Sequence, residues 1–285
     1  MSLVLETAPP IHRRADPTTA RILMFDSGLG GLTVLAATRT LLPGAEVTYL
    51  ADDAVFPYGR LDEPTLVARV VEVMERVIPR LDPHAVVIAC NTASTLVLKP
   101  LRARWPALPF VGTVPAIKPA AAASRSKHIS VLATPGTAAR DYTRDLVRSF
   151  ADGCEVTLVG APQLASLAEA AMRGEPVPDG DVAREIAPAF VARDGRRTDT
   201  VVLACTHYPL LMPVFERLAP WPVLYVDPAP AIARRASAVL ADAGLALDAE
   251  APALPFTAVF TSDRVPAGSL RTALEARGLG RIARF

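Results

Sequence analysis

The chain has 285 residues, a formal net charge of +1 and 51% hydrophobic residues. This length is enough for one large domain or two medium-sized domains. The near-neutral charge gives no long-range field that would favour binding to nucleic acid or to an acidic membrane surface. No run of 18 apolar residues occurs, so no membrane-spanning helix is expected.

The first residues and the cysteines indicate where the protein acts. Residues 1–20 include Glu6, Asp16 and three prolines, without an apolar core of signal-peptide length, so we expect a loose extension. Three cysteines are too few, and odd in number, for a disulfide framework. They favour a reducing compartment, and the cytoplasm is the expected location.

Short β-branched apolar segments recur along the chain and are predicted to be strands: 21–26, 46–52, 84–90, 108–113, 128–134, 154–160, 199–205, 222–227 and 256–262. Most are continuous apolar runs, which are typical of strands buried on both faces of a parallel sheet. Helical spacing predicts helices between them at 63–78, 137–150 and 230–244. Alternating strands and helices predict an α/β fold with crossover connections.

Two of the predicted strands end in nearly the same string, "VVIACNT" over 86–92 and "VVLACTH" over 201–207. In parallel sheets, sites form beyond the carboxyl ends of the strands. Two similar doubly wound domains facing each other across a cleft would therefore oppose Cys90 and Cys205. A buried structural role is the alternative for one such cysteine, but the polar residues that follow both copies disfavour it. Cys154 has no such motif and is expected to be structural.

The stretch "FDSGLGGLTV" over 25–34 leads from a strand into a helix through a glycine-rich turn. Backbone N–H groups at such a turn can hold an anion, although a plain tight turn would also explain the glycines. The pattern is neither GxGxxG nor a P-loop, so nucleotide binding is disfavoured. Asp26 ends the strand where α/β enzymes place their chemistry.

A second loop, "ADDAVFPYGRLDEP" over 51–64, also follows a strand. Asp52 and Asp53 lack further ligands at metal-binding spacing, and turn chemistry explains both residues, so no metal site is predicted. Tyr58 and Gly59 could present a hydroxyl and a backbone N–H to a ligand. His207 lies two residues after Cys205; the other histidines, His12, His84 and His128, receive no role.

The strings "DSGLGG", "PYG", "ACNTAS" and "CTHYPLL" occur in this order, each at the end of a predicted strand. Together they resemble the glutamate racemases, cofactor-independent enzymes that make D-glutamate for peptidoglycan. The resemblance covers about residues 21–245, with "GTVPAIKPA" and "LATPGTAARDYT" in further agreement. We expect residues 21–112 and about 230–285 to form the first domain and 113–229 the second. The helix after Asp227 would cross back and tie them together.

The resemblance also implies roles for single residues. It assigns Cys90 to the D-glutamate face and Cys205 to the L-glutamate face, with Asp26 and His207 as their helpers. Substrate binding would fall to a set around the two thiols: Asp26, Ser27, Tyr58, Gly59, Asn91, Thr92, Thr206 and His207. Pyridoxal phosphate is not expected, since none of the three lysines stands in a site-like motif. No metal is expected either, because the paired aspartates lack further ligands.

The resemblance extends to ligands and assembly. The string "VPAIKPAA" is similar to that of a bacterial subgroup of these enzymes, which the wall precursor UDP-N-acetylmuramoyl-alanine activates. Glutamate is the expected small-molecule partner, and the resemblance leaves a homodimer open.

Racemisation explains why two thiols would be needed. One group must remove the α-proton and another must return a proton to the opposite face. A cysteine thiolate at neutral pH needs a helix N-terminus or a cation nearby, and both cysteines precede a predicted helix. An aspartate or broad-specificity racemase is the alternative enzyme. A non-catalytic amino-acid-binding module would explain a cleft but not the paired thiols.

Overall fold

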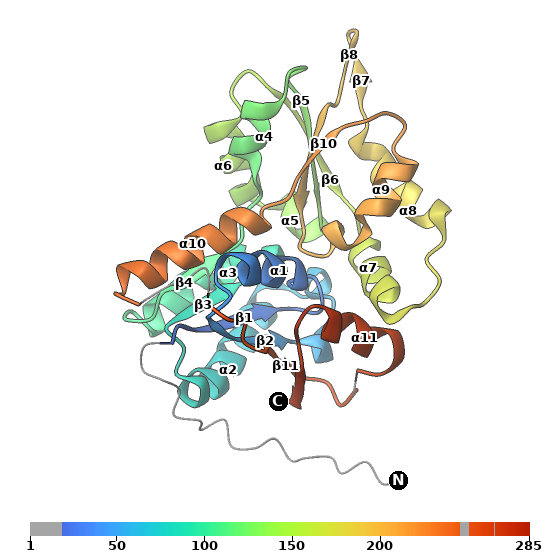
Figure 1. Cartoon of the computed structure of the whole chain (residues 1–285). Coiled ribbons are helices and arrows are strands. Elements are labelled where there is room, and N and C mark those ends of the chain that lie inside the picture. The colour runs from blue at the N-terminus through green and yellow to red at the C-terminus, as the bar shows by residue number, and fades with distance from the viewer. Residues whose placement is uncertain (1–18, 246–250, 265) are drawn as a thin grey trace.

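The computed structural model describes residues 19–245, 251–264 and 266–285. The predicted extension over residues 1–20 therefore lies outside the described residues except for Thr19 and Ala20. The described chain forms two lobes, each built on a parallel sheet with helices packed against it (Figure 1). No helix in these ranges is long and apolar enough to cross a membrane.

The first lobe contains a six-stranded sheet in the order β12-β11-β2-β1-β3-β4, with all neighbours parallel. Its strands are β1 Arg21–Asp26, β2 Glu46–Ala51, β3 Ala85–Ile88, β4 Phe110–Gly112, β11 Thr257–Phe260 and β12 Arg281–Arg284. Its helices are α1 Leu32–Leu41, α2 Glu63–Leu81, α3 Asn91–Arg104, α10 Ala229–Asp242 and α11 Gly268–Ala276.

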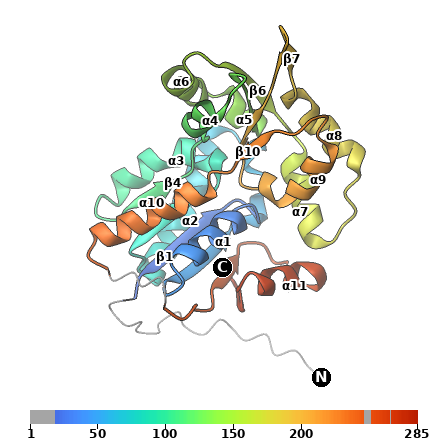
Figure 2. The ribbon, with the colours of Figure 1, turned by 45° about the horizontal axis from the view of Figure 1, so that its top comes forward.

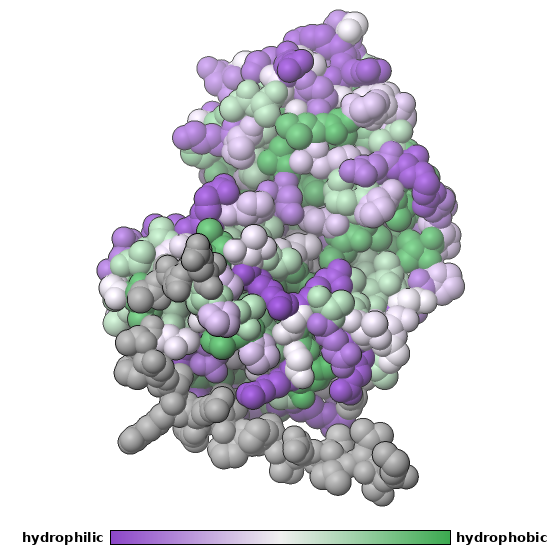
Figure 3. All heavy atoms as spheres, viewed as in Figure 1, coloured by the Kyte–Doolittle hydropathy of each residue, from purple (hydrophilic) through white to green (hydrophobic). Residues whose placement is uncertain are grey.

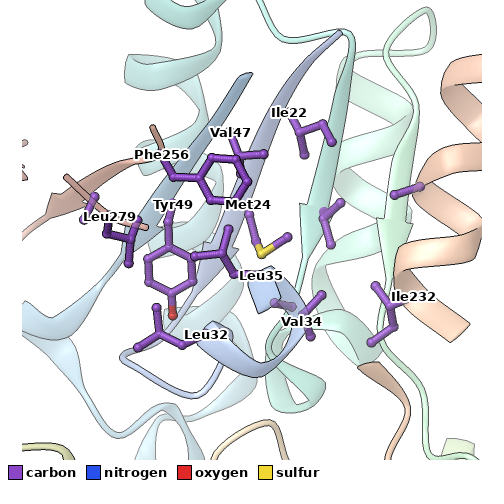
Figure 4. Close-up of a cluster of buried hydrophobic side chains, with 14 of the residues drawn as sticks. Ile22, Met24, Leu32, Val34, Leu35, Val47, Tyr49, Ile232, Phe256 and Leu279 are labelled. Atoms are coloured by element: carbon purple, nitrogen blue, oxygen red, sulfur yellow. The ribbon is translucent and has the colours of Figure 1, made fainter. Parts of the chain in front are cut away.

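Side-chain alternation explains how both faces of this sheet are covered. Ile22 and Met24 of β1 point to the face packed by α1, α10 and α11 (Figure 4). Leu23 and Phe25 point to the opposite face, which is packed by α2 and α3. The continuous apolar runs predicted a sheet buried on both sides, and the structure confirms this.

The second lobe contains a four-stranded parallel sheet in the order β10-β9-β5-β6. Its strands are β5 His128–Ala133, β6 Glu155–Gly160, β9 Thr200–Ala204 and β10 Leu224–Val226. Its helices are α4 Ile117–Ala123, α5 Pro135–Ala139, α6 Asp141–Phe150, α7 Leu164–Arg173, α8 Asp179–Ile186 and α9 Met212–Leu218. Helices α7, α8 and α9 pack one face, and α4 and α6 pack the other.

A short antiparallel hairpin, β7 Ala192–Arg193 and β8 Arg196–Arg197, projects from the second lobe. It forms the hydrophilic tip at the top of Figure 3 and is exposed throughout. Short 3-10 turns occupy Asp53–Val55, Tyr58–Arg60, Ala187–Ala189 and Tyr208–Leu211. The sequence patterns did not predict the hairpin or strand β12, because both are short and rich in arginine.

The chain passes between the lobes after β4 and after β10. Helix α10 then packs back against α1, β3 and β4, as expected for the helix after Asp227 (Figure 2). The predicted helix over 137–150 is two helices, α5 and α6, because Arg140 between them is extended. The first sheet takes strands from 21–112 and 257–284, and the second from 128–226. The exact domain limits stay a prediction.

Both sheets reverse their winding beside their first strand. In the first sheet, β2 and β3 lie on either side of β1; in the second, β6 and β9 lie on either side of β5. Such switch points leave a crevice at the carboxyl ends of the two strands. Asp26 ends β1 and Cys90 lies just after β3, while Thr134 and Cys205 follow β5 and β9. The two equivalent crevices carry the two cysteines.

Asp52 and Asp53 do more than form the turn that their sequence indicates. Buried Asp52 accepts hydrogen bonds from Arg69 at 2.6 and 2.9 Å, from the Tyr58 hydroxyl at 2.5 Å and from the Thr261 hydroxyl at 2.7 Å. Asp53 accepts from the backbone and hydroxyl of Ser262. The two carboxylates therefore fasten the chain after β11 to the loop after β2.

Replacing Asp52 with alanine should lower the free energy of unfolding by about 3–5 kcal/mol, because Arg69 would lose its buried counter-charge. Urea unfolding followed by circular dichroism measures this change. The matched control is Asp145→Ala, which removes an exposed partner of Arg148 and should cost less than about 1 kcal/mol. Equal effects of the two substitutions would show that the Asp52 network does not stabilise the fold.

Candidate active site

The crevices of the two lobes meet and enclose the predicted site residues. The Thr206 hydroxyl of the second lobe donates to Asp26 Oδ2 at 3.0 Å, and the Thr92 and Thr134 hydroxyls lie 3.0 Å apart. Both cysteines are buried, with exposed fractions of 5% for Cys90 and 6% for Cys205. The structure therefore holds the two lobes closed on the site.

Cys90 lies at the junction between β3 and α3. It is the N-cap residue of α3, and its thiol donates to Ser27 Oγ at 3.6 Å. Burial and the negative charge of Asp26 raise the pKa of Cys90 to about 12, although the Ala93 N–H and the hydrogen bond with Ser27 act in the opposite direction. In this closed form Cys90 carries its proton and can donate it.

Asp26 lies between the two lobes. Its Oδ1 accepts from the Gly28 N–H at 2.8 Å, and its Oδ2 accepts from Thr206. Burial raises the pKa of Asp26 against the opposing effects of His207 and of these hydrogen bonds. A carboxyl group with a raised pKa beside a thiol is a candidate acid/base helper.

The glycines of the turn after Asp26 allow the second lobe to approach. A Cβ atom at Gly30 would overlap Nδ1 of His207 and Oγ1 of Thr206, and one at Gly31 would lie 2.9 Å from Cβ of Asp26. The turn is therefore tight, which by itself would explain its glycines. It is also part of the contact between the lobes.

The second thiol has a different environment. Cys205 Sγ lies 3.9 Å from His207 Nδ1, and His207 Nε2 lies 3.0 Å from Glu169 Oε1. Burial alone would lower the pKa of His207, but the hydrogen bonds to Cys205 and Glu169 outweigh it and raise that pKa well above its usual value. The surroundings of Cys205 therefore favour the protonated, cationic form of His207.

The chain after Cys205 differs from the expected helix start. A four-residue 3-10 turn, Tyr208–Leu211, comes first, and α9 begins only at Met212. The support that a helix N-terminus gives to a thiolate is therefore weaker at Cys205 than at Cys90. The cation of His207 takes its place.

Glu169 on α7 is the site residue that the sequence patterns missed. Its Oε1 accepts from the Leu29 N–H at 2.6 Å as well as from His207, and its Oε2 accepts from Arg173 at 2.8 Å. Burial acts to raise the pKa of Glu169, but these donors lower it below its usual value. The sequence did contain one signal for this residue, because Glu169 is a carboxylate within the largely apolar helical segment "LASLAEAAMR".

Several predicted binding residues lie around the thiols. Both side-chain polar atoms of Asn91 are buried and have no hydrogen-bond partner among the described residues. Because buried amides are normally satisfied, this one is available to a ligand. Thr92 and Asn91 form the first turn of α3, whose N–H groups favour an anion.

The sequence predicts that Tyr58 offers its hydroxyl, and Gly59 its backbone N–H, to a ligand. The Tyr58 hydroxyl donates to buried Asp52, and Tyr58 belongs to the same apolar cluster as Cys90, so the presentation of this hydroxyl to a ligand stays a prediction. A Cβ atom at Gly59 would lie 3.5 Å from Cβ of Thr134, which brings this loop close to the other lobe. Cys154 packs with the apolar cluster under α4 and α6.

The arrangement can move protons on two sides of one bound molecule. One crevice offers a protonated thiol with a carboxyl neighbour, and the other offers a thiol beside a cation. The polar groups between them suit a small ligand that carries carboxylates.

Comparison with known proteins agrees with this geometry. Residues 33–236 match the Asp/Glu/hydantoin racemase family. The chain is 56% identical over 239 residues to a glutamate racemase of Brucella anthropi, covering 83% of this chain and 86% of that protein. It resembles the Escherichia coli glutamate racemase, solved with L-glutamate and the activator UDP-MurNAc-Ala, with a TM-score of 0.84, 37% identity and coverage of 94% and 98%. It also resembles a glutamate racemase of Bacillus anthracis, with a TM-score of 0.75, 25% identity and coverage of 94% of this chain and 97% of that chain.

Replacing Glu169 with glutamine should lower the pKa of His207, because the substitution removes a carboxylate that stabilises the imidazolium. Two-dimensional NMR of the imidazole signals across a pH series measures this directly, since the chain has only four histidines. The control signal is His84, which contacts Arg21 at the opposite end of β1 from Asp26 and should not change. An unchanged His207 titration would remove Glu169 from the proposed charge arrangement.

Proposed function

Because the chain belongs to the Asp/Glu/hydantoin racemase family, we propose that it interconverts L-glutamate and D-glutamate and supplies D-glutamate for peptidoglycan. One observation carries this proposal above the others. The proposal is supported by the position of Cys90 and Cys205 after topologically equivalent strands of the two sheets, together with the contacts that join the two strand ends across the lobes. Two opposed thiols are what a two-base exchange of one α-proton requires.

The proton balance follows from the two environments. With L-glutamate bound, the thiolate of Cys205 takes the α-proton and Cys90 delivers its own proton to the opposite face of Cα. The enzyme then holds a proton on Cys205 and a thiolate at Cys90, which is the form that accepts D-glutamate. The raised pKa of Cys90 keeps its proton in place until a carbanion forms.

Charged neighbours stabilise the alternating charge. His207, held by Glu169, compensates the thiolate at Cys205 in one state. In the other state, the first turn of α3 faces the thiolate at Cys90, and Ser27 and the Ala93 N–H act in the same direction. Among the charged groups, Asp26 has the largest effect on the pKa of Cys90, and we propose it as the helper of this thiol.

The substrate is proposed to lie between the two crevices. Asn91 has a free amide, and Thr92, Thr206 and Ser27 offer hydroxyls for the two carboxylates of glutamate. Tyr58 and Gly59 complete the set carried over from the family. Burial strengthens each of these interactions, because water no longer competes with them.

Further parts of the proposal concern ligands and location. No cofactor is needed, since side chains perform both proton transfers. The Escherichia coli relative was solved with UDP-MurNAc-Ala as activator, and we propose the same activator here. Cytoplasmic location is proposed because the reaction needs free thiols, and all three cysteines are free. Self-association as a homodimer is also part of the proposal.

Two alternatives remain distinguishable by substrate. An aspartate or broad-specificity racemase would use the same thiols, but the similar proteins named above are glutamate racemases. A binding module without turnover would leave the opposed thiols unexplained. Chiral chromatography after incubation with each amino acid separates the three cases.

Replacing either Cys90 or Cys205 with alanine should abolish racemisation, because no other group covers the face that the lost thiol served. Removal of an acid/base group costs about 10²- to 10⁴-fold in rate. The measurement is the loss of optical rotation from L-glutamate. Cys154→Ala is the matched control and should keep wild-type turnover. Near-normal turnover in either active-site variant would disprove the two-thiol mechanism.

In deuterated water, the D-glutamate formed from L-glutamate should carry deuterium at Cα from the first turnovers. Cys90 has exchanged with solvent beforehand, whereas the proton taken by Cys205 stays isolated while the site is closed. The α-proton signal of each enantiomer is measured at low conversion after chiral separation. D-glutamate should give the mirror result. Substantial protium in the early product would indicate a single base.

A further inference from the structure

Arg140 makes a contact between the lobes that the proton transfers themselves do not use. It lies between α5 and α6 of the second lobe, in extended conformation. Its Nη1 donates to the backbone oxygen of Thr92 at 2.8 Å and also to the Thr95 hydroxyl. Its Nε lies 3.5 Å from Glu63 Oε1. All three partners belong to the first lobe.

The segment before Arg140 contacts the same turn. The hydroxyls of Thr134 and Thr137 lie 3.0 and 3.4 Å from the Thr92 hydroxyl. Thr134, Thr137 and Arg140 are spaced three residues apart, so one short segment of the second lobe encloses the first turn of α3. Cys90 is the N-cap of that helix, and Asn91 is its first residue.

The burial of Arg140 makes this contact depend on closure. Its side chain is 13% exposed, and burial lowers its pKa, with Glu63 and Cys90 acting in the opposite direction. An arginine remains charged in proteins, and a buried charge without partners is costly. The partners named above are present only while the lobes are together, so separation of the lobes must return both the guanidinium and the Thr92 carbonyl to water.

The two sides of the site are held by different contacts. On the Cys205 side, Glu169 accepts from Leu29, and Thr206 donates to Asp26. Neither of these contacts involves Arg140. Loss of the guanidinium should therefore loosen the Cys90 side selectively.

We propose that Arg140 is a positioning residue that latches the second lobe over Cys90, keeping this thiol isolated from water while it holds a proton. This inference rests on the proposed racemase function. It concerns how long the Cys90 thiol stays isolated from water, a property that the identity of the two bases does not determine. With D-glutamate as substrate, Cys90 takes the α-proton. A latched site returns that same proton or completes the reaction.

The test measures deuterium uptake into unreacted substrate. Wild type and Arg140→Gln are incubated briefly with D-glutamate in deuterated water. The amount of deuterium in the remaining D-glutamate is then divided by the amount of L-glutamate formed. The same ratio is measured from L-glutamate, where Cys205 takes the proton. Arg140→Gln should raise the ratio for D-glutamate by the order of tenfold, as expected for loss of a charged hydrogen-bond donor, and leave the ratio for L-glutamate unchanged.

Matched variants separate a latch from general loosening. Arg144→Gln removes the same charge one turn later on α6, where Arg144 is half-exposed and pairs with Asp141. It should behave as wild type in both ratios. Glu63→Gln removes only the partner of Nε and should raise the D-glutamate ratio by a smaller factor. Arg140→Lys keeps the charge but not the planar fork, and should fall between wild type and Arg140→Gln.

The outcomes decide the proposal. Equal increases from both enantiomers in Arg140→Gln would show general loosening, and no increase would show that Arg140 does not seal the site; either result overturns the latch. If Arg140→Gln fails to fold, as judged by its thermal transition, Arg140→Lys and Glu63→Gln decide by the same ratios. Absence of racemisation in the wild type would instead refute the proposed function itself.

Discussion

The hydrogen-bonded series from the Leu29 N–H through Glu169 to His207 is the interaction on which the closed site depends. It joins the glycine-rich turn of the first lobe to a helix and a strand end of the second. Removing an ionised carboxylate and an imidazolium from water is costly, and the cost is offset only because each finds a partner of opposite charge and further donors. Closure of the lobes and charging of His207 therefore support each other.

The two lobes share their topology but not their electrostatics. Each places a thiol beyond a switch point of a parallel sheet, as expected for α/β sites. Cys90 begins a full α-helix and faces Asp26, while Cys205 precedes a short 3-10 turn and lies beside a cation. Under the proposed mechanism, charge on each face of the substrate would therefore be stabilised by a different means.

Closure also sets a requirement for turnover. The predicted site residues are buried, apart from the half-buried Gly59, so the lobes must separate for substrate to enter and product to leave. The contacts described between them are mostly hydroxyls, backbone groups and single charged side chains, which water can satisfy after opening. Such polar contacts are typical of domain interfaces that move. The two chain crossings and α10 keep the lobes connected during that motion.

The sequence alone determined the class of fold and the two thiols. Continuous apolar runs report burial on both faces, so nine strands followed from local patterns. The repeated strings mark equivalent strand ends and predicted Cys90 and Cys205 as a pair, while the resemblance to a known family predicted Asp26 and His207 as their helpers. Only the tertiary structure decided which distant groups pair. Glu169 meets Leu29 across 140 positions, Asp52 meets Thr261 across 209, and Arg140 ends a helix to reach Thr92. Local periodicity cannot report such pairs, because a buried carboxylate or guanidinium is tolerated only where two separately folded surfaces bring its partner.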